Sequence, residues 1–154
     1  MDDGDVRAVD TPTGSVENKT WAGDLASLAL RLALGVVMAF HGLDKVGDVE
    51  GFAGFVDSLG VPAPTLMAYV VTYLELLGGI ALILGLATRY VSALFAIEMV
   101  FTIALVKIDV GLIAAEGGAG AELDLLVLAI ALSLLLTGAG SWSVDAAFTG
   151  RRRV

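Results

Sequence analysis

The sequence predicts an all-α integral membrane protein: a bundle of four transmembrane helices with a short interfacial amphipathic helix between the first two. Hydrophobic residues make up 57% of the 154 residues, charged residues only 17%, and the mean hydropathy is +0.86. A water-soluble domain of this size could not cover so much apolar material with polar surface. The apolar residues also gather in four runs, each close to the roughly 20 residues that cross a bilayer.

The four runs set the expected organisation of the chain. We place them at 24–43, 66–86, 90–106 and 122–136. Residues 1–23 are expected to form a disordered acidic cytoplasmic tail, 24–146 the membrane domain and 147–154 a basic cytoplasmic tail. Only 87–89 join the second and third runs, so these two helices are expected to form an antiparallel hairpin.

The segment between the first two runs has a different pattern. Apolar residues recur at helical spacing between acidic ones and are followed by Gly60, Pro62 and Pro64; they are Val49, Phe52, Ala53, Val56 and Leu59. This pattern predicts a short amphipathic helix that lies at the membrane interface and ends before the prolines.

Composition also excludes several functions. Without cysteine, the chain has no thiolate nucleophile, disulfide or Cys-ligated metal, so redox chemistry needs a cofactor or a partner. One histidine cannot form a metal site by itself, and we expect none. The net charge of −8 disfavours nucleic acid as a partner and is typical of a halophile-like acidic chain.

The distribution of basic residues predicts the orientation. A chain with four spans has both tails and the second connection on one side of the membrane. These segments hold six of the nine Lys and Arg residues: Arg7, Lys19, Arg89, Arg151, Arg152 and Arg153. Because basic flanks stay inside, we expect a multi-pass protein of the cell membrane with cytoplasmic N- and C-termini.

Two carboxyl groups inside the apolar runs are the candidate catalytic residues, Glu75 and Glu98. A charge at the centre of a bilayer costs at least about 2.5–3.5 kcal/mol, so such residues usually face the bundle interior. Both are expected at similar depth on neighbouring helices. They could exchange protons, or they could be neutral acids that hydrogen-bond each other and support helix packing.

Two further polar residues lie near the end of the first run, His41 and Lys45. They share a helical face or its edge with Arg31, Gly35 and Gly42. Either side chain could donate a hydrogen bond to the polar head group of a ligand.

The motifs together resemble DoxX-family membrane proteins over roughly residues 28 to 146. The matching strings are Arg31-Leu-Ala-Leu-Gly35, His41-Gly42-x-x-Lys45, Gly54-Phe55, Leu59-Gly60-x-Pro62, Glu75-Leu-Leu-Gly78-Gly79, Leu84-Gly85-Leu-x-Thr88-Arg89, Gly117-Gly118-x-Gly120-x-Glu122 and Gly138-x-Gly140-x-x-Ser143-x-Asp145. The chain departs from the family where a histidine often ends the third span, because Lys107 stands there.

The resemblance implies a four-helix fold related to the small subunits of thiosulfate:quinone oxidoreductase. It also implies ligand-binding positions at His41, Lys45, Arg89 and Glu122, and a ligand contact at Glu75. The position of Glu122 at the start of the fourth run gives it a second interpretation, as an acid that stabilises the beginning of a helix through the helix dipole.

Three functions follow as hypotheses. The first is a quinone-associated redox subunit whose intramembrane carboxyls handle protons, with quinone as a non-covalent cofactor and a soluble or membrane redox partner. The second is a non-catalytic membrane anchor or assembly factor for a soluble redox enzyme. The third is a small proton-coupled transporter. Each is compatible with contact to the lipid bilayer and with a homo-oligomer.

Overall fold

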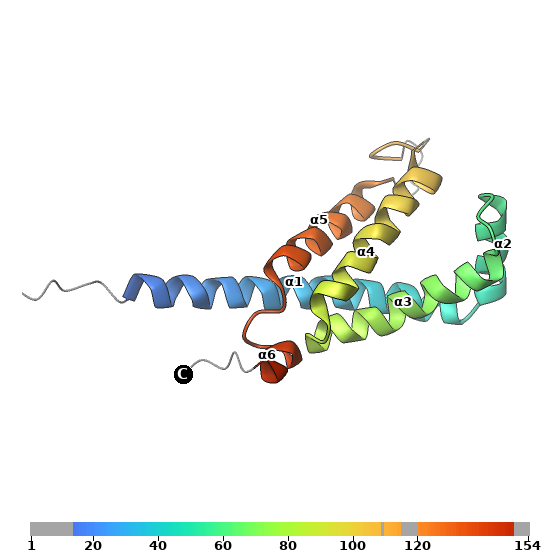
Figure 1. Ribbon diagram of the computed structural model, residues 1–154. Helices are drawn as coiled ribbons and strands as arrows, with labels where there is room; N and C mark the ends of the chain where they lie inside the picture. The colour runs from blue at the N-terminus through green and yellow to red at the C-terminus, as the bar shows by residue number, and fades with distance from the viewer. Residues whose placement is uncertain (1–13, 109, 115–119, 150–154) are drawn as a thin grey trace, which may run out of the picture.

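A computed structural model describes residues 14–108, 110–114 and 120–149 (Figure 1). The described residues form helices and connecting loops, with no strand among them. The helices are α1 (Gly14–Val46), α2 (Val49–Ser58), α3 (Pro64–Leu84), α4 (Thr88–Thr102), the π-helical turn η1 (Ile103–Lys107), α5 (Glu122–Thr137) and α6 (Val144–Phe148). The predicted class, a helical membrane protein, is confirmed.

Three of these helices are long and apolar enough to cross a membrane: Trp21–Val46, Pro64–Leu84 and Thr88–Lys107. They correspond to the first three predicted runs. The fourth run forms α5, whose 16 residues extend for about 24 Å. This length is below the roughly 30 Å of the hydrocarbon core, so α5 is a short fourth helix.

The ends of the chain differ in part from the expectation. The first helix begins at Gly14, so it extends well before the predicted start at Asp24. The rest of the predicted acidic tail, 1–13, and residues 150–154 of the basic tail lie outside the described residues. The predicted interfacial helix is present as α2, where the Asp48 carboxylate accepts a hydrogen bond from the Gly51 amide.

The helices associate as two pairs. In Figure 1, α1 and α3 lie side by side, whereas α4 and α5 run together at an angle to them. The first pair is unusually close because glycines meet backbone: a Cβ on Gly42 would lie 2.3 Å from the Leu76 amide nitrogen, and one on Gly79 would lie 2.5 Å from that of Ala39. Only glycine at these positions allows this approach.

The expected hairpin between the second and third runs is therefore modified. The connection is short, and the chain reverses direction after Gly85 and Ala87, which adopt left-handed backbone conformations. However, α3 packs mainly against α1, and α4 mainly against α5. Gly79 lies on the face of α3 that meets α1 and accounts for this pairing, because it allows the two helix backbones to approach closely.

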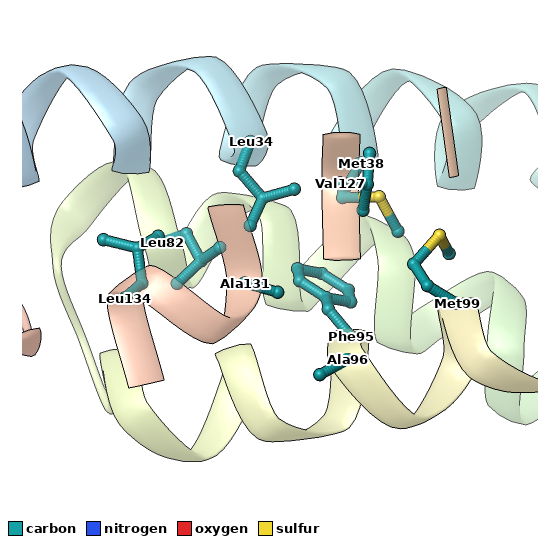
Figure 2. Close-up of a cluster of buried hydrophobic side chains, with 9 residues drawn as sticks. All are labelled: Leu34, Met38, Leu82, Phe95, Ala96, Met99, Val127, Ala131 and Leu134. Atoms are coloured by element: carbon teal, nitrogen blue, oxygen red, sulfur yellow. The ribbon is translucent and has the colours of Figure 1, made fainter. Parts of the chain in front are cut away.

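An apolar core joins the two pairs. It is formed by Leu34, Met38, Leu82, Phe95, Ala96, Met99, Val127, Ala131 and Leu134 (Figure 2). Phe95 of α4 is fully buried, and its ring lies against Gly78 of α3, since a Cβ there would be 3.0 Å from Phe95 Cζ. The core thus draws side chains from α1, α3, α4 and α5.

The C-terminal segment, residues 138–149, braces one end of this arrangement, which we call the α6 side. The Asp145 carboxylate accepts hydrogen bonds from the backbone amides of Ala87 (2.7 Å) and Thr88 (2.9 Å) at the start of α4. The fully buried Arg31 donates through Nη2 to the Trp142 carbonyl oxygen. The opposite end, which carries α2, is the α2 side.

Candidate functional site

The principal polar feature among the helices is an ion pair between α1 and α3. Lys45, in the last turn of α1, donates from Nζ to both carboxylate oxygens of Glu75, at 2.9 Å to Oε1 and 2.7 Å to Oε2. The Glu75 side chain is 6% exposed and that of Lys45 20%. Gly42, one turn before Lys45, allows α1 to approach α3 closely enough for this contact.

Glu98 of α4 joins this pair. Its carboxyl interacts electrostatically with both Glu75 and Lys45, and it lies within hydrogen-bonding reach of Glu75. Lys45, Glu75 and Glu98 therefore form one group across three helices, which we call the charged cluster. The expected proximity of the two carboxyls is found in the structure.

Phe52 of α2 completes the surroundings of Lys45. The ammonium nitrogen lies 5.2 Å from the centroid of the Phe52 ring, a cation–π distance. Since Ala53 and Val56 of the same helix are buried, α2 is packed in place beside the cluster.

Two oxygen atoms near the cluster are buried without a hydrogen-bond partner. They are Glu98 Oε2 and Thr72 Oγ1, the latter one turn before Glu75 on the buried face of α3. Buried polar atoms in native proteins almost always have a partner, so these two are candidate contacts for a ligand or water. In the described ranges, no three His, Cys, Asp or Glu side chains gather as metal ligands.

The charge of the cluster determines its chemistry. Lys45 and an ionised Glu75 neutralise each other, so the state of Glu98 sets the net charge. An apolar environment favours the neutral arrangement, in which the two carboxyls together hold one proton. Such a group can take up or release a proton with a change of one charge.

The other candidate residues lie elsewhere. His41 is exposed on α1, outside the charged cluster. Arg89 is exposed on the α6 side, where Nη2 donates to the Leu136 carbonyl oxygen at 3.2 Å. Glu122 is exposed in the first turn of α5. The structure does not bring these three side chains together with Glu75, and their role in ligand binding stays a prediction.

Sequence reasoning missed the partner of Lys45 on α2 and the role of Asp145. From the sequence alone, Phe52 is placed only on the apolar face of the amphipathic helix. Its position shortly after Lys45, across a two-residue turn, is a signal that its ring could reach the ammonium group. Asp145 enters the sequence analysis only as the last residue of the Gly138-x-Gly140-x-x-Ser143-x-Asp145 motif. Its carboxylate caps α4 and lies near the buried guanidinium of Arg31, a contact between residues far apart in sequence.

Comparison with known proteins places these residues in a family. Residues 26–108, more than half of the chain, match the family model described as DoxX. The chain belongs to the DoxX family. The charged cluster lies inside the matched region, whereas α5 and the C-terminal segment lie beyond it.

Two relatives extend the match. A Bacillus subtilis protein named "Putative oxidoreductase CatD" is 37% identical over 122 residues, which cover 79% of this chain and 86% of that protein. A Mycobacterium tuberculosis protein named "Uncharacterized membrane protein Rv3486" is 31% identical over 132 residues, covering 80% of this chain and 81% of that protein. No solved structure matches this DoxX-family chain.

Proposed function

We propose that this DoxX-family protein is the membrane subunit of a quinone-linked oxidoreductase and that its charged cluster exchanges protons with the quinone. The observation that carries the proposal is the convergence of Lys45, Glu75 and Glu98 from three helices inside an apolar bundle. A relative named as an oxidoreductase supports it.

The residues present fit a quinone. The ring of a quinone is apolar and uncharged, and it carries oxygen substituents that need hydrogen-bond partners. Glu98 Oε2 is buried and without a partner beside a neutral ion pair, and the surrounding helix faces are apolar. When bound, a quinone would supply two-electron chemistry, taking up two electrons and two protons to become the quinol.

The protein's own residues would exchange the protons and hold the charged cluster in position beside the ligand. Glu98 is the carboxyl that we assign to proton exchange, because both oxygens of Glu75 already accept hydrogen bonds from Lys45. Phe52 and Gly42 keep the ammonium in place. The electrons would come from a flavin, haem or metal centre of a redox partner protein, since the chain has no cysteine to carry them.

The position of the cluster favours access from one side. Along α1, Arg31 lies on the α6 side and Lys45 on the α2 side, with the core residues Leu34 and Met38 between them. Phe95 belongs to the same apolar layer. This apolar layer separates the cluster from the α6 side. It therefore favours a site that a ligand reaches from the α2 side, and it disfavours a transporter with a continuous polar path. In the orientation that the basic residues favour, the α2 side faces outward across the cell membrane.

Quinone content and turnover test the proposal together. We would purify the protein with its bound partners from native membranes in a mild detergent, and then measure quinone in the lipid extract and quinone reduction by the complex. We expect about one quinone per protein. Glu98→Gln should keep it but lower the rate by about 100-fold or more, because general acid–base catalysis contributes at least that factor.

Glu50→Gln is the matched control, because Glu50 is exposed on α2 and outside the cluster. Its rate should equal that of the wild type. A wild-type extract without quinone would overturn the proposal. A full rate in Glu98→Gln, with the partner still attached, would instead favour the anchor hypothesis, in which the intramembrane acids have no catalytic part.

A further inference from the structure

A buried hydroxyl group lies beside the charged cluster. The Thr72 side chain is fully buried on α3, and its Oγ1 has no hydrogen-bond partner. Thr72 shares the buried face of this helix with Glu75, three residues later. Side chains at this spacing are neighbours on a helix, with Cβ atoms about 5–6 Å apart. The hydroxyl-bearing side chain is therefore next to the ion pair.

This hydroxyl differs from others of the chain because it does not bond to its own helix. A threonine inside a helix commonly donates to the carbonyl oxygen four residues earlier. Thr102 does so to Glu98 at 3.1 Å, and Thr137 to Ser133 at 2.8 Å. Thr72 makes neither this bond nor another. An unpaired buried hydroxyl destabilises the fold, and an oxygen atom of a ligand would remove that cost.

The other polar groups of the charged cluster already have tasks. Lys45 donates to both carboxylate oxygens of Glu75 and faces the ring of Phe52. Glu98 is the carboxyl assigned to proton exchange. Thr72 offers an uncharged hydroxyl, which can either donate or accept a hydrogen bond. It can therefore bind an oxygen atom of a ligand both before and after that oxygen has gained a hydrogen.

The position of Thr72 fits the expected route of entry. Helix α3 begins on the α2 side at Pro64, so Thr72 lies three residues, or about 4.5 Å, closer to that side than Glu75 does. The apolar layer closes off the α6 side of the cluster. A ligand that enters from the α2 side would therefore reach Thr72 before it reaches the carboxyl of Glu75.

Given the proposed quinone site, on which this inference rests, we infer that the Thr72 hydroxyl binds an oxygen of the ligand ring in both redox states. It donates to the carbonyl oxygen of the oxidised form and accepts from the hydroxyl of the reduced form. Proton exchange stays with Glu98. Loss of the Thr72 hydroxyl should weaken binding of both forms by a similar factor of about tenfold, because the buried ligand oxygen loses its partner.

Equilibrium binding tests this inference without turnover. The full-length protein in lipid nanodiscs would be titrated anaerobically with a decyl-substituted benzoquinone and with its quinol. Thr72→Val keeps nearly the same shape without the hydroxyl and should bind both ligands about tenfold more weakly. Thr72→Ser keeps the hydroxyl and should bind both nearly as tightly as the wild type. Thr137→Val is the matched control, because that hydroxyl is exposed and bonds to its own helix, and it should leave both affinities unchanged.

The Tm of the ligand-free protein separates a binding role from a structural one. Thr72→Val removes a buried hydroxyl without a partner, so its Tm should equal or exceed that of the wild type. A lower Tm would mean that the hydroxyl has a partner within the fold. That result would overturn the inference, whatever the affinities.

The binding data also distinguish this inference from the proposed function. Equal affinities in the wild type and Thr72→Val, or a loss for only one of the two redox forms, would overturn the role of Thr72 and leave the quinone site standing. If the wild type binds neither ligand and native extracts hold no quinone, the proposed function itself fails.

Discussion

Single glycines decide how closely the helices of this protein can approach. Gly42 and Gly79 stand where α1 and α3 cross, and a Cβ on either would meet backbone atoms of the other helix closer than 3.0 Å. Backbone cannot move aside as a side chain can. These two residues therefore set the distance across which Lys45 reaches Glu75.

Gly42→Ala should force α1 and α3 apart. Overpacking of this kind costs about 1–3 kcal/mol, and thermal unfolding in detergent, followed by circular dichroism, should show a lower Tm. Gly23→Ala is the matched control on the same helix, because a Cβ there would meet no described atom within 4 Å. Its Tm should be unchanged or slightly higher, as alanine favours helix. Equal losses of Tm in both variants would contradict the role given to Gly42.

At the scale of elements, the C-terminal segment holds the start of α4 in place. The first amides of a helix have no partner within the helix, and Asp145 supplies one to both Ala87 and Thr88. The same carboxylate lies near the buried guanidinium of Arg31. The Asp145 amide also donates to the carbonyl oxygen of Gly85 at the end of α3, so this short C-terminal segment connects α1, α3 and α4.

Asp145→Ala should release this contact. We expect a loss of about 1–3 kcal/mol, because buried donors lose their acceptor. Hydrogen exchange followed by mass spectrometry should show faster exchange in peptides that contain the Ala87 and Thr88 amides. Asp57→Ala, at an exposed position of α2, is the control and should leave these peptides unchanged. Unaltered exchange in Asp145→Ala would refute the capping role.

At the scale of the whole molecule, the protein consists of two helix pairs joined by one core (Figures 1 and 2). The pair α1–α3 carries the ion pair, and the pair α4–α5 brings Glu98 to it. Their contact depends on Phe95, which lies against Gly78 of α3. The charged cluster is thus complete only when the two pairs are docked.

Phe95→Ala should weaken this docking. A cavity left by a buried phenylalanine costs about 3–5 kcal/mol, so equilibrium unfolding should show a marked loss of stability. Phe101→Ala is the control on the same helix, since Phe101 is 59% exposed and Phe95 is fully buried. We expect it to change stability by no more than about 0.5 kcal/mol. Similar effects of both substitutions would mean that Phe95 does not join the pairs.

Much of the fold follows from local properties of the chain. The lengths and apolar character of the runs predict the spans to within a few residues, and helical spacing predicts α2 before the prolines. The buried stripe of Ala68, Thr72, Glu75 and Gly79 follows from periodicity as well. These features depend on neighbours in sequence, and the free energy of placing each segment in a bilayer fixes them.

The sequence by itself determined that this is a helical membrane protein with two carboxyls at similar depth. Only the tertiary structure decided which helices pair, that Lys45 binds Glu75 beside Phe52, and that His41, Arg89 and Glu122 lie away from this group. The reason is physical. The free energy of transfer to the bilayer is a property of each segment by itself. The choice of partner helix depends instead on close packing between surfaces that are far apart in the chain, and here Gly42, Gly79 and the buried ring of Phe95 determine it.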